Sequence, residues 1–216
     1  MKEVSIHKMG QAIGSYVAKK VTRLDQTEIL AYGAEILLGS VVKLSILFFT
    51  AIMMGVVIEV TVLLIVTGLI RTLSGGAHCT AYYRCLVTSV FILTVFGYLI
   101  KIIYPVIRLL PTSFFLGIIA LIAYMYWRYA PQAPSNKPFR NRKMELYFRW
   151  YTLMAVAMIS IISIALGTDS LISWVMAFAL LWQAFTLTPA GHRFISLLDI
   201  LLTFRKRGGE AECKRL

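Results

Sequence analysis

The sequence predicts an all-α polytopic membrane protein, with about six transmembrane helices and an amphipathic interfacial helix at the N-terminus. Three observations support this class. Hydrophobic residues make up 59% of the 216 residues, and the mean hydropathy is +0.76, whereas soluble domains are roughly 45–50% apolar. Several apolar runs approach the ~20 residues that cross a bilayer. Lys and Arg residues cluster between these runs, as they do in the cytoplasmic loops of membrane proteins.

The N-terminal segment 4–24 has the pattern of an amphipathic helix. Its apolar side chains recur at helical spacing, and its other side carries Lys8, Gln11, Ser15, Lys19 and Arg23. A helix with an apolar face and a basic face usually lies in the membrane interface and does not cross it. The charged first thirty residues do not resemble a cleavable signal sequence.

The contiguous apolar stretch 36–70 is too long for one crossing, because as a helix it would measure about 52 Å. A break near Gly55 divides it into two spans. The predicted spans are then 29–54, 56–72, 85–104, 113–130, 150–167 and 170–188. We expect one membrane domain over 1–216, with an interfacial helix at 1–28, a transmembrane bundle at 29–188 and a basic cytoplasmic tail at 189–216.

The positive charges orient these spans. With six crossings, 19 of the 22 Lys and Arg residues fall on one side, in the N-terminal region, the 71–84 loop, the segment 128–149 and the C-terminal tail. That side is predicted to be cytoplasmic. The net charge of +12 therefore reflects membrane topology, and the lipid bilayer, not nucleic acid, is the expected partner. The three cysteines, Cys79, Cys85 and Cys213, show no zinc or disulfide spacing, so we expect no metal and no cofactor.

A polar segment between two apolar runs, 71–85, carries the chemistry. It reads Arg71-Thr-Leu-Ser-Gly-Gly-Ala-His78-Cys-Thr-Ala-Tyr-Tyr-Arg-Cys85. A thiolate is the strongest common side-chain nucleophile near neutral pH, and a neighbouring imidazole stabilises it. We therefore predict that Cys85 is the nucleophile and His78 the base. Cys79 is a second candidate nucleophile, disfavoured because adjacent side chains seldom reach each other.

Geometry sets a condition on this pair. On one continuous helix, His78 and Cys85 would lie about 10.5 Å apart along the axis, too far for proton transfer. The helix must therefore break, and Gly75 and Gly76 provide the backbone freedom. Their N–H groups are candidate oxyanion donors. Arg71 and Arg84 are candidates to hold a substrate carboxylate or carbonyl.

Several other polar residues have more than one reading. Ser89 lies one turn beyond Cys85 and either lines the same pocket or bonds its own backbone. Charges within a span are costly, so Glu35 and Lys43 are candidates to pair across helices, to orient the histidine or to stabilise a dimer. The Lys137–Arg149 segment either sets topology or docks an acidic part of the substrate. His7 and His192 are expected to be interfacial.

The run Arg71…Gly75-Gly76-Ala77-His78…Cys85 resembles the central motif of the AgrB family, the accessory gene regulator B membrane peptidases. Ala130-Pro131…Asn136-Lys137-Pro138 resembles that family's basic loop, and Gln183-Ala-Phe-Thr-Leu-Thr-Pro189 its final span. Cys79 departs from the family pattern. The resemblance covers nearly the whole chain, and the spaced His and Cys with the preceding Arg and Gly are its specific part.

The resemblance implies a cysteine endopeptidase of quorum sensing. Such a protein removes the C-terminal segment of an AgrD-like propeptide through a thioester acyl-enzyme, and a thiolactone or lactone ring then closes. It also implies a homodimer and a substrate with an acidic tail, which Lys137 and its neighbours would bind. Two alternatives remain open. A small peptide exporter or channel-like protein would need a polar pathway through the bilayer, and a scaffolding subunit would leave the Gly-Gly-Ala-His loop without a purpose.

Overall fold

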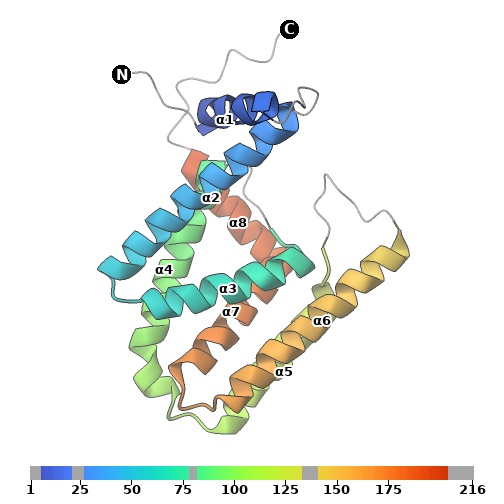
Figure 1. Ribbon diagram of the computed structural model, residues 1–216. Helices are drawn as coiled ribbons and strands as arrows, with labels where there is room; N and C mark the ends of the chain where they lie inside the picture. Colours follow the sequence, from blue (N-terminus) through green and yellow to red (C-terminus); the bar gives the residue numbers. More distant parts are fainter. Residues whose placement is uncertain (1–5, 21–26, 78–81, 133–140, 204–216) are drawn as a thin grey trace. The chain divides into compact units, whose positions relative to one another are not determined.

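The computed structural model describes residues 6–20, 27–77, 82–132 and 141–203, and all regular structure in these ranges is helical. The helices are α1 (Ile6–Lys20), α2 (Thr27–Met53), α3 (Val57–Ser74), α4 (Tyr82–Ile107), α5 (Thr112–Tyr129), α6 (Arg142–Ala165), α7 (Leu171–Leu187) and α8 (Pro189–Thr203) (Figure 1). They form two compact units that divide after Met53. The predicted all-α polytopic class is confirmed.

The first unit packs α1 against α2 through small residues. A Cβ added to Gly14 would lie 2.4 Å from the backbone of Ala31, and one added to Gly10 would lie 2.9 Å from Cβ of Glu35. Gly10, Gly14 and Ala18 are all buried and recur every four residues, a spacing that lets two helix backbones approach closely. The larger apolar side chains of α1, such as Met9 and Tyr16, remain exposed.

The break that the sequence predicted near Gly55 is present. Helix α2 ends at Met53 and α3 begins at Val57, with Gly55 between them at φ 65°. A left-handed residue cannot continue a right-handed helix, and glycine adopts this conformation without a steric cost. The long apolar stretch therefore forms two helices.

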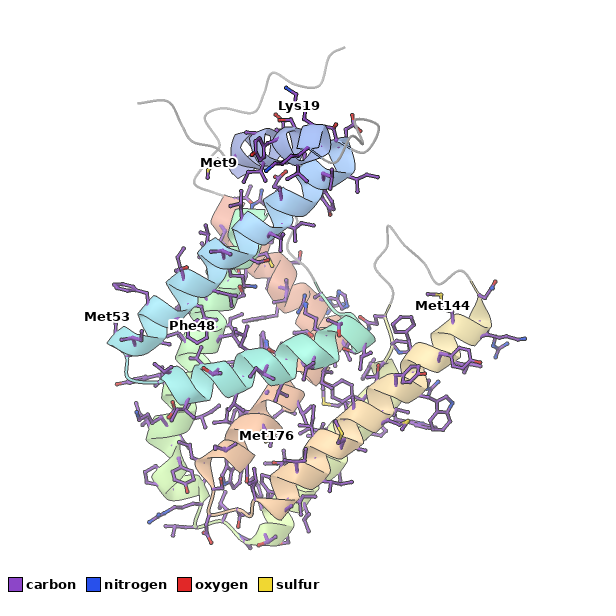
Figure 2. All side chains as sticks on the ribbon, viewed as in Figure 1. Met9, Lys19, Phe48, Met53, Met144 and Met176 are labelled. Atoms are coloured by element: carbon purple, nitrogen blue, oxygen red, sulfur yellow. The ribbon has the colours of Figure 1, made fainter. Side chains whose placement is uncertain are left out.

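Helix α7 is the centre of the second unit, where it contacts α3, α4, α5, α6 and α8. Most of its residues are buried. The rings of Trp174 and Phe115 pack in an edge-to-face arrangement with their centroids 4.9 Å apart. The Tyr126 hydroxyl donates to the carbonyl of Leu180 at 3.1 Å. Figure 2 shows side chains filling the space around α7, including the labelled Met176. Because protein surrounds it, α7 can carry polar side chains.

The end of α3 and the segment after α5 meet at one end of the second unit. There, the amide of Gln132, which follows α5, donates to the carbonyl of Ser74 at the end of α3 at 2.8 Å. At the opposite end, the Lys101 ammonium donates to the carbonyl of Gly55 and the Tyr104 hydroxyl to that of Asp169. The end of α3 and the end of α5 therefore share one end of this unit.

The number of spans differs from the six predicted. Among the described residues, four helices are long and apolar enough to cross a membrane, namely α2, α3, α4 (over Arg84–Ile107) and α6. The count becomes five if α7 and α8, which meet at 86°, form one broken span. Helix α7 has 17 residues, about 26 Å at 1.5 Å per residue, which is short for a crossing.

Two boundaries are corrected. Helix α6 begins at Arg142, eight residues before the predicted span, so Lys143 and Arg149 lie on a helix and not in a loop. Helix α8 occupies 189–203, where a basic tail was expected. Proline is favoured at the first helical position, and Pro189 starts α8. Gly191 allows the close turn from α7, because a Cβ there would lie 2.0 Å from the carbonyl oxygen of Phe185.

Candidate active site

The end of α3 carries the predicted helix break. The N–H of Gly75 donates to the carbonyl of Arg71 at 3.0 Å, and Gly75 and Gly76 have φ angles of 74° and 130°. A Cβ on Gly75 would lie 2.0 Å from the carbonyl oxygen of Gln132. The helix therefore stops at Ser74, and only glycine fits the next position. The hydrogen bond to Arg71 occupies the Gly75 N–H, which had been a candidate oxyanion donor, whereas the part of the chain described here contains no partner for the Gly76 N–H.

Helix α7 holds the segment after the break. The side-chain amide of Gln183 donates to the carbonyl of Gly75 at 2.8 Å and to the hydroxyl of Ser74 at 3.3 Å. The N–H of Ala77 donates to the carbonyl of Thr186 at 3.3 Å. Gln183 and Thr186 are each 1% exposed. The backbone from Ser74 to Ala77 is thus fixed to a buried part of the bundle.

Arg71 of α3 also holds the Ser74–Ala77 segment. Its guanidinium donates to the carbonyl of Ala77. The sequence offered Arg71 as a ligand for a substrate carboxylate or carbonyl, and the structure places it on a backbone carbonyl of its own loop. The residue before position 78 therefore has hydrogen bonds on both its N–H and its C=O.

Cys85 lies in the first turn of α4, where it is half-buried and outside any disulfide. Ile92 follows it by seven residues, about two helical turns, and so lies on the same face of α4. Ile92 forms a buried apolar cluster with Ala77 and with Ile195 of α8. Phe96, Trp182 and Leu198 pack against this cluster. Ala77 therefore lies against α4 at Ile92, on the helix face that carries Cys85 and about 10.5 Å from it along the axis.

His78, Cys79 and Lys137 lie outside the described residues. In the sequence, His78 and Cys79 follow directly after Ala77, and the described chain resumes at Tyr82. Among the residues described, no group of three or more His, Cys, Asp or Glu side chains has a metal-binding arrangement.

Arg84, Ser89 and Glu35 have structural partners. The guanidinium of Arg84 lies 3.2 Å from a carboxylate oxygen of Asp199 in α8, and both side chains are largely buried. The Ser89 hydroxyl donates to the carbonyl of Leu86 at 3.0 Å, within its own helix. Glu35 is half-buried in α2, beside Gly10 of α1. Lys43 is half-buried in the same helix.

Two residues that the sequence did not assign to the site are joined to it. The side chain of Gln132 donates to the carbonyl of Leu187 and meets Nε2 of His192 at 2.8 Å, while its backbone N–H bonds Ser74. His192 is exposed and was expected only to be interfacial. Gln132 directly follows the Ala130-Pro131 pair, and this position was the one sequence feature that could have indicated its place at the site. Nothing in the sequence indicated that Asp199 would contact the site, because the segment that forms its helix was expected to be a tail.

The fold and this arrangement define a class: an all-α polytopic membrane protein in which a glycine ends one helix and a cysteine lies in the first turn of the next. The model of the family "AgrB: Accessory gene regulator B" matches residues 10–187. This chain belongs to the AgrB family.

Relatives agree with this assignment. The chain is 25% identical over 186 residues to an AgrB-like protein of Clostridium perfringens (strain SM101 / Type A), covering 81% of this chain and 87% of the relative. It is 23% identical over 209 residues to AgrB-like protein 2 of Clostridium perfringens (strain 13 / Type A), covering 88% and 97%. No solved structure matches this chain with significance. Family membership supports a role in processing the peptide of agr quorum sensing.

Proposed function

We propose that this chain is a membrane-embedded cysteine endopeptidase that removes the C-terminal segment of an AgrD-like propeptide, with Cys85 as nucleophile and His78 as base. One observation carries the proposal: Ala77, the residue before His78, is hydrogen-bonded to α3 and α7 and packs in one cluster with Ile92, which shares its α4 face with Cys85. The peptidase domain is taken as the whole chain, 1–216.

In the proposed reaction, His78 takes the proton of the Cys85 thiol, and the thiolate attacks the carbonyl carbon of the scissile bond. Cys85 lies in the first turn of α4, and a helix N-terminus is a favourable place for negative charge. The C–N bond then breaks, His78 returns the proton to the leaving amine, and a thioester joins the peptide to Cys85. The Gly76 N–H remains the candidate donor to the oxyanion.

Ring closure uses the same thioester. A Cys or Ser of the peptide attacks the thioester carbonyl, its proton passes to His78, and the Cys85 sulfur leaves as a thiolate that His78 reprotonates. A cysteine nucleophile gives a thiolactone and a serine nucleophile a lactone. Thiol exchange changes one thioester into another, and water, which would hydrolyse the thioester, is scarce at the membrane edge.

The remaining proposals concern topology and partners. The site is placed on the cytoplasmic side with both termini, because the positive charges gather there. Lys137 and the basic residues near it bind the acidic tail of the propeptide, and the active protein is a homodimer. Each follows from the charge pattern or from family membership.

The test is cleavage of a propeptide by the purified protein in liposomes. The parent is expected to release the C-terminal fragment, whereas Cys85→Ala and His78→Ala release none although they insert and fold normally. Cys213→Ala is the matched control, since it removes a cysteine far along the chain from the motif, and Cys79→Ser tests the second candidate nucleophile. Normal cleavage by Cys85→Ala would refute the proposal.

The exporter reading is less well supported. Gln183 is one of the few polar side chains in the middle of a predicted span, and its amide is engaged by Gly75 and Ser74. It therefore holds a loop and does not line a pathway. Uptake of a labelled propeptide into vesicles containing the Cys85→Ala protein would favour export instead.

A further inference from the structure

We propose that Gln183 is a positioning residue of the peptidase site, which fixes the Ser74–Ala77 backbone beside the α4 face that carries Cys85. The inference rests on the proposed function and adds to it a residue that the His–Cys pair does not identify. Gln183 touches neither Cys85 nor, in the proposed reaction, the substrate. It acts through the loop.

The hydrogen bonds of Gln183 are placed to do this. Its amide nitrogen has two N–H groups, and it reaches two acceptors on opposite sides of the helix break, the Ser74 hydroxyl in α3 and the Gly75 carbonyl after it. Gln183 comes from α7, the helix that contacts all its neighbours in this unit. The segment after the break is therefore held by α7, the most enclosed helix of the bundle.

Burial makes the interaction consequential. Gln183 is 1% exposed and Ser74 is fully buried, so neither can readily exchange this hydrogen bond for one to water. An apolar side chain at 183 would remove the shorter of the two hydrogen bonds to the Gly75 carbonyl and leave only the one from the Ser74 hydroxyl at 3.3 Å, and the loss of a hydrogen-bond partner in a buried site is expensive. The loop would then be expected to shift, and Ala77 with it. A displacement of about 1 Å is enough to impair a catalytic pair.

Helix α7 also holds the segment through Thr186, about one helical turn after Gln183. The carbonyl of Thr186 accepts from the N–H of Ala77 at 3.3 Å. Gln183 itself accepts from the Thr186 hydroxyl through its backbone carbonyl at 2.7 Å. The two anchors hold the first and last residues of the segment, and the side-chain anchor is the one that a substitution can remove selectively.

The experiment measures the alkylation rate of Cys85 by iodoacetamide in the full-length protein, with Cys79→Ser and Cys213→Ser present so that one thiol remains. This rate reports the thiolate without any peptide. His78→Ala is expected to lower it, and Gln183→Leu to lower it about tenfold, toward the His78→Ala value. Tyr126→Phe is the matched control. It removes a buried hydrogen bond to the same helix, at Leu180, and should leave the rate within about twofold of the parent.

Gln183→Glu adds a readout that loss of stability does not mimic. The neutral carboxyl can donate an O–H to the Gly75 carbonyl, whereas the ionised carboxylate has no donor. An ionised carboxylate is costly in a buried site, so the neutral form is favoured as the pH falls. The ratio of the Gln183→Glu rate to the Gln183→Leu rate should therefore increase as the pH falls. Both variants lack the donor at high pH, so the Gln183→Leu protein provides the matching titration of the thiol.

The outcomes separate the two proposals. If His78→Ala lowers the rate but Gln183→Leu does not, or if the Gln183→Glu ratio does not change with pH, the role of Gln183 is refuted and the peptidase survives. If His78→Ala leaves the rate unchanged, the His–Cys pair fails, and the role of Gln183 fails with it. Equal losses in Gln183→Leu and Tyr126→Phe would mean that Gln183 only stabilises the fold.

Discussion

Nη1 of Arg84 lies 3.2 Å from Oδ2 of Asp199, and Arg84 is the residue directly before Cys85. The pair joins the first turn of α4 to α8, a helix that the sequence did not predict. The side chains are 17% and 11% exposed, so solvent screens the pair only partly. The positive charge next to the proposed nucleophile is therefore compensated within the protein.

Breaking this pair should destabilise the start of α4. Asp199→Ala leaves Arg84 largely buried without that carboxylate, and we expect a loss of about 1.5–3 kcal/mol, the range for a hydrogen bond to a charged group. Thermal unfolding in detergent measures it. The double variant Arg84→Met/Asp199→Leu should recover much of the loss, because an apolar pair of similar size often replaces a buried ion pair at little cost. A double variant less stable than Asp199→Ala would contradict this account.

Gly75→Ala should impair the site. The residue has a φ of 74°, and its Cβ would lie 2.0 Å from the carbonyl oxygen of Gln132. A left-handed non-glycine residue alone costs about 1–2 kcal/mol, and the overlap forces the loop away from Gln132. We expect propeptide cleavage to fall at least about tenfold.

Gly68→Ala is the control for that substitution. Gly68 lies in α3, the helix that ends just before Gly75, and a Cβ there meets nothing within 4 Å. Alanine favours a helix over glycine, so this variant should be at least as stable and cleave at the parent rate. Equal activity of the Gly75→Ala and Gly68→Ala proteins would argue against a fixed loop geometry.

Gly14→Val should separate α1 from α2. Even a single Cβ at Gly14 would lie 2.4 Å from the Ala31 backbone, and overpacking a close contact typically costs about 1–3 kcal/mol. The expected result is faster cleavage by trypsin after Lys19 and Lys20, which are exposed at the end of α1. Gly33→Val is the matched control, because a Cβ at Gly33 meets nothing within 4 Å. Unchanged trypsin cleavage in Gly14→Val would show that α1 does not depend on this contact.

Arg71→Ala distinguishes two roles for the arginine. If Arg71 acts by holding the Ala77 carbonyl, the variant should lower cleavage by a similar factor for propeptides with acidic and with neutral tails. If Arg71 binds a substrate carboxylate, the loss should be larger for the acidic tail. We expect equal losses, measured as kcat/KM for the two peptides. Arg71→Lys should recover part of the activity, since an ammonium can still donate to one carbonyl.

The amino-acid pattern alone predicted the class, the motif and the main helix break. Apolar runs of bilayer length do not depend on tertiary contacts, because the lipid selects them directly. The break after Ser74 was also predictable, since Gly75-Gly76 is the locally permitted place for positive φ angles. The break at Gly55 followed from length alone.

Tertiary structure decided the span count, α8 and the partners of the site. Helix α7 is short, and its polar Gln183 is tolerated because five helices surround it, which a hydropathy pattern does not reveal. From the sequence, residues 189–203 were expected to belong to a basic tail. The contact between Asp199 and Arg84 shows that they pack on the bundle. Gln132, Gln183 and Asp199 are far from the motif in sequence, and a hydrogen bond between distant segments leaves no local signature. Only the packing of α7 and α8 brings these side chains to the loop.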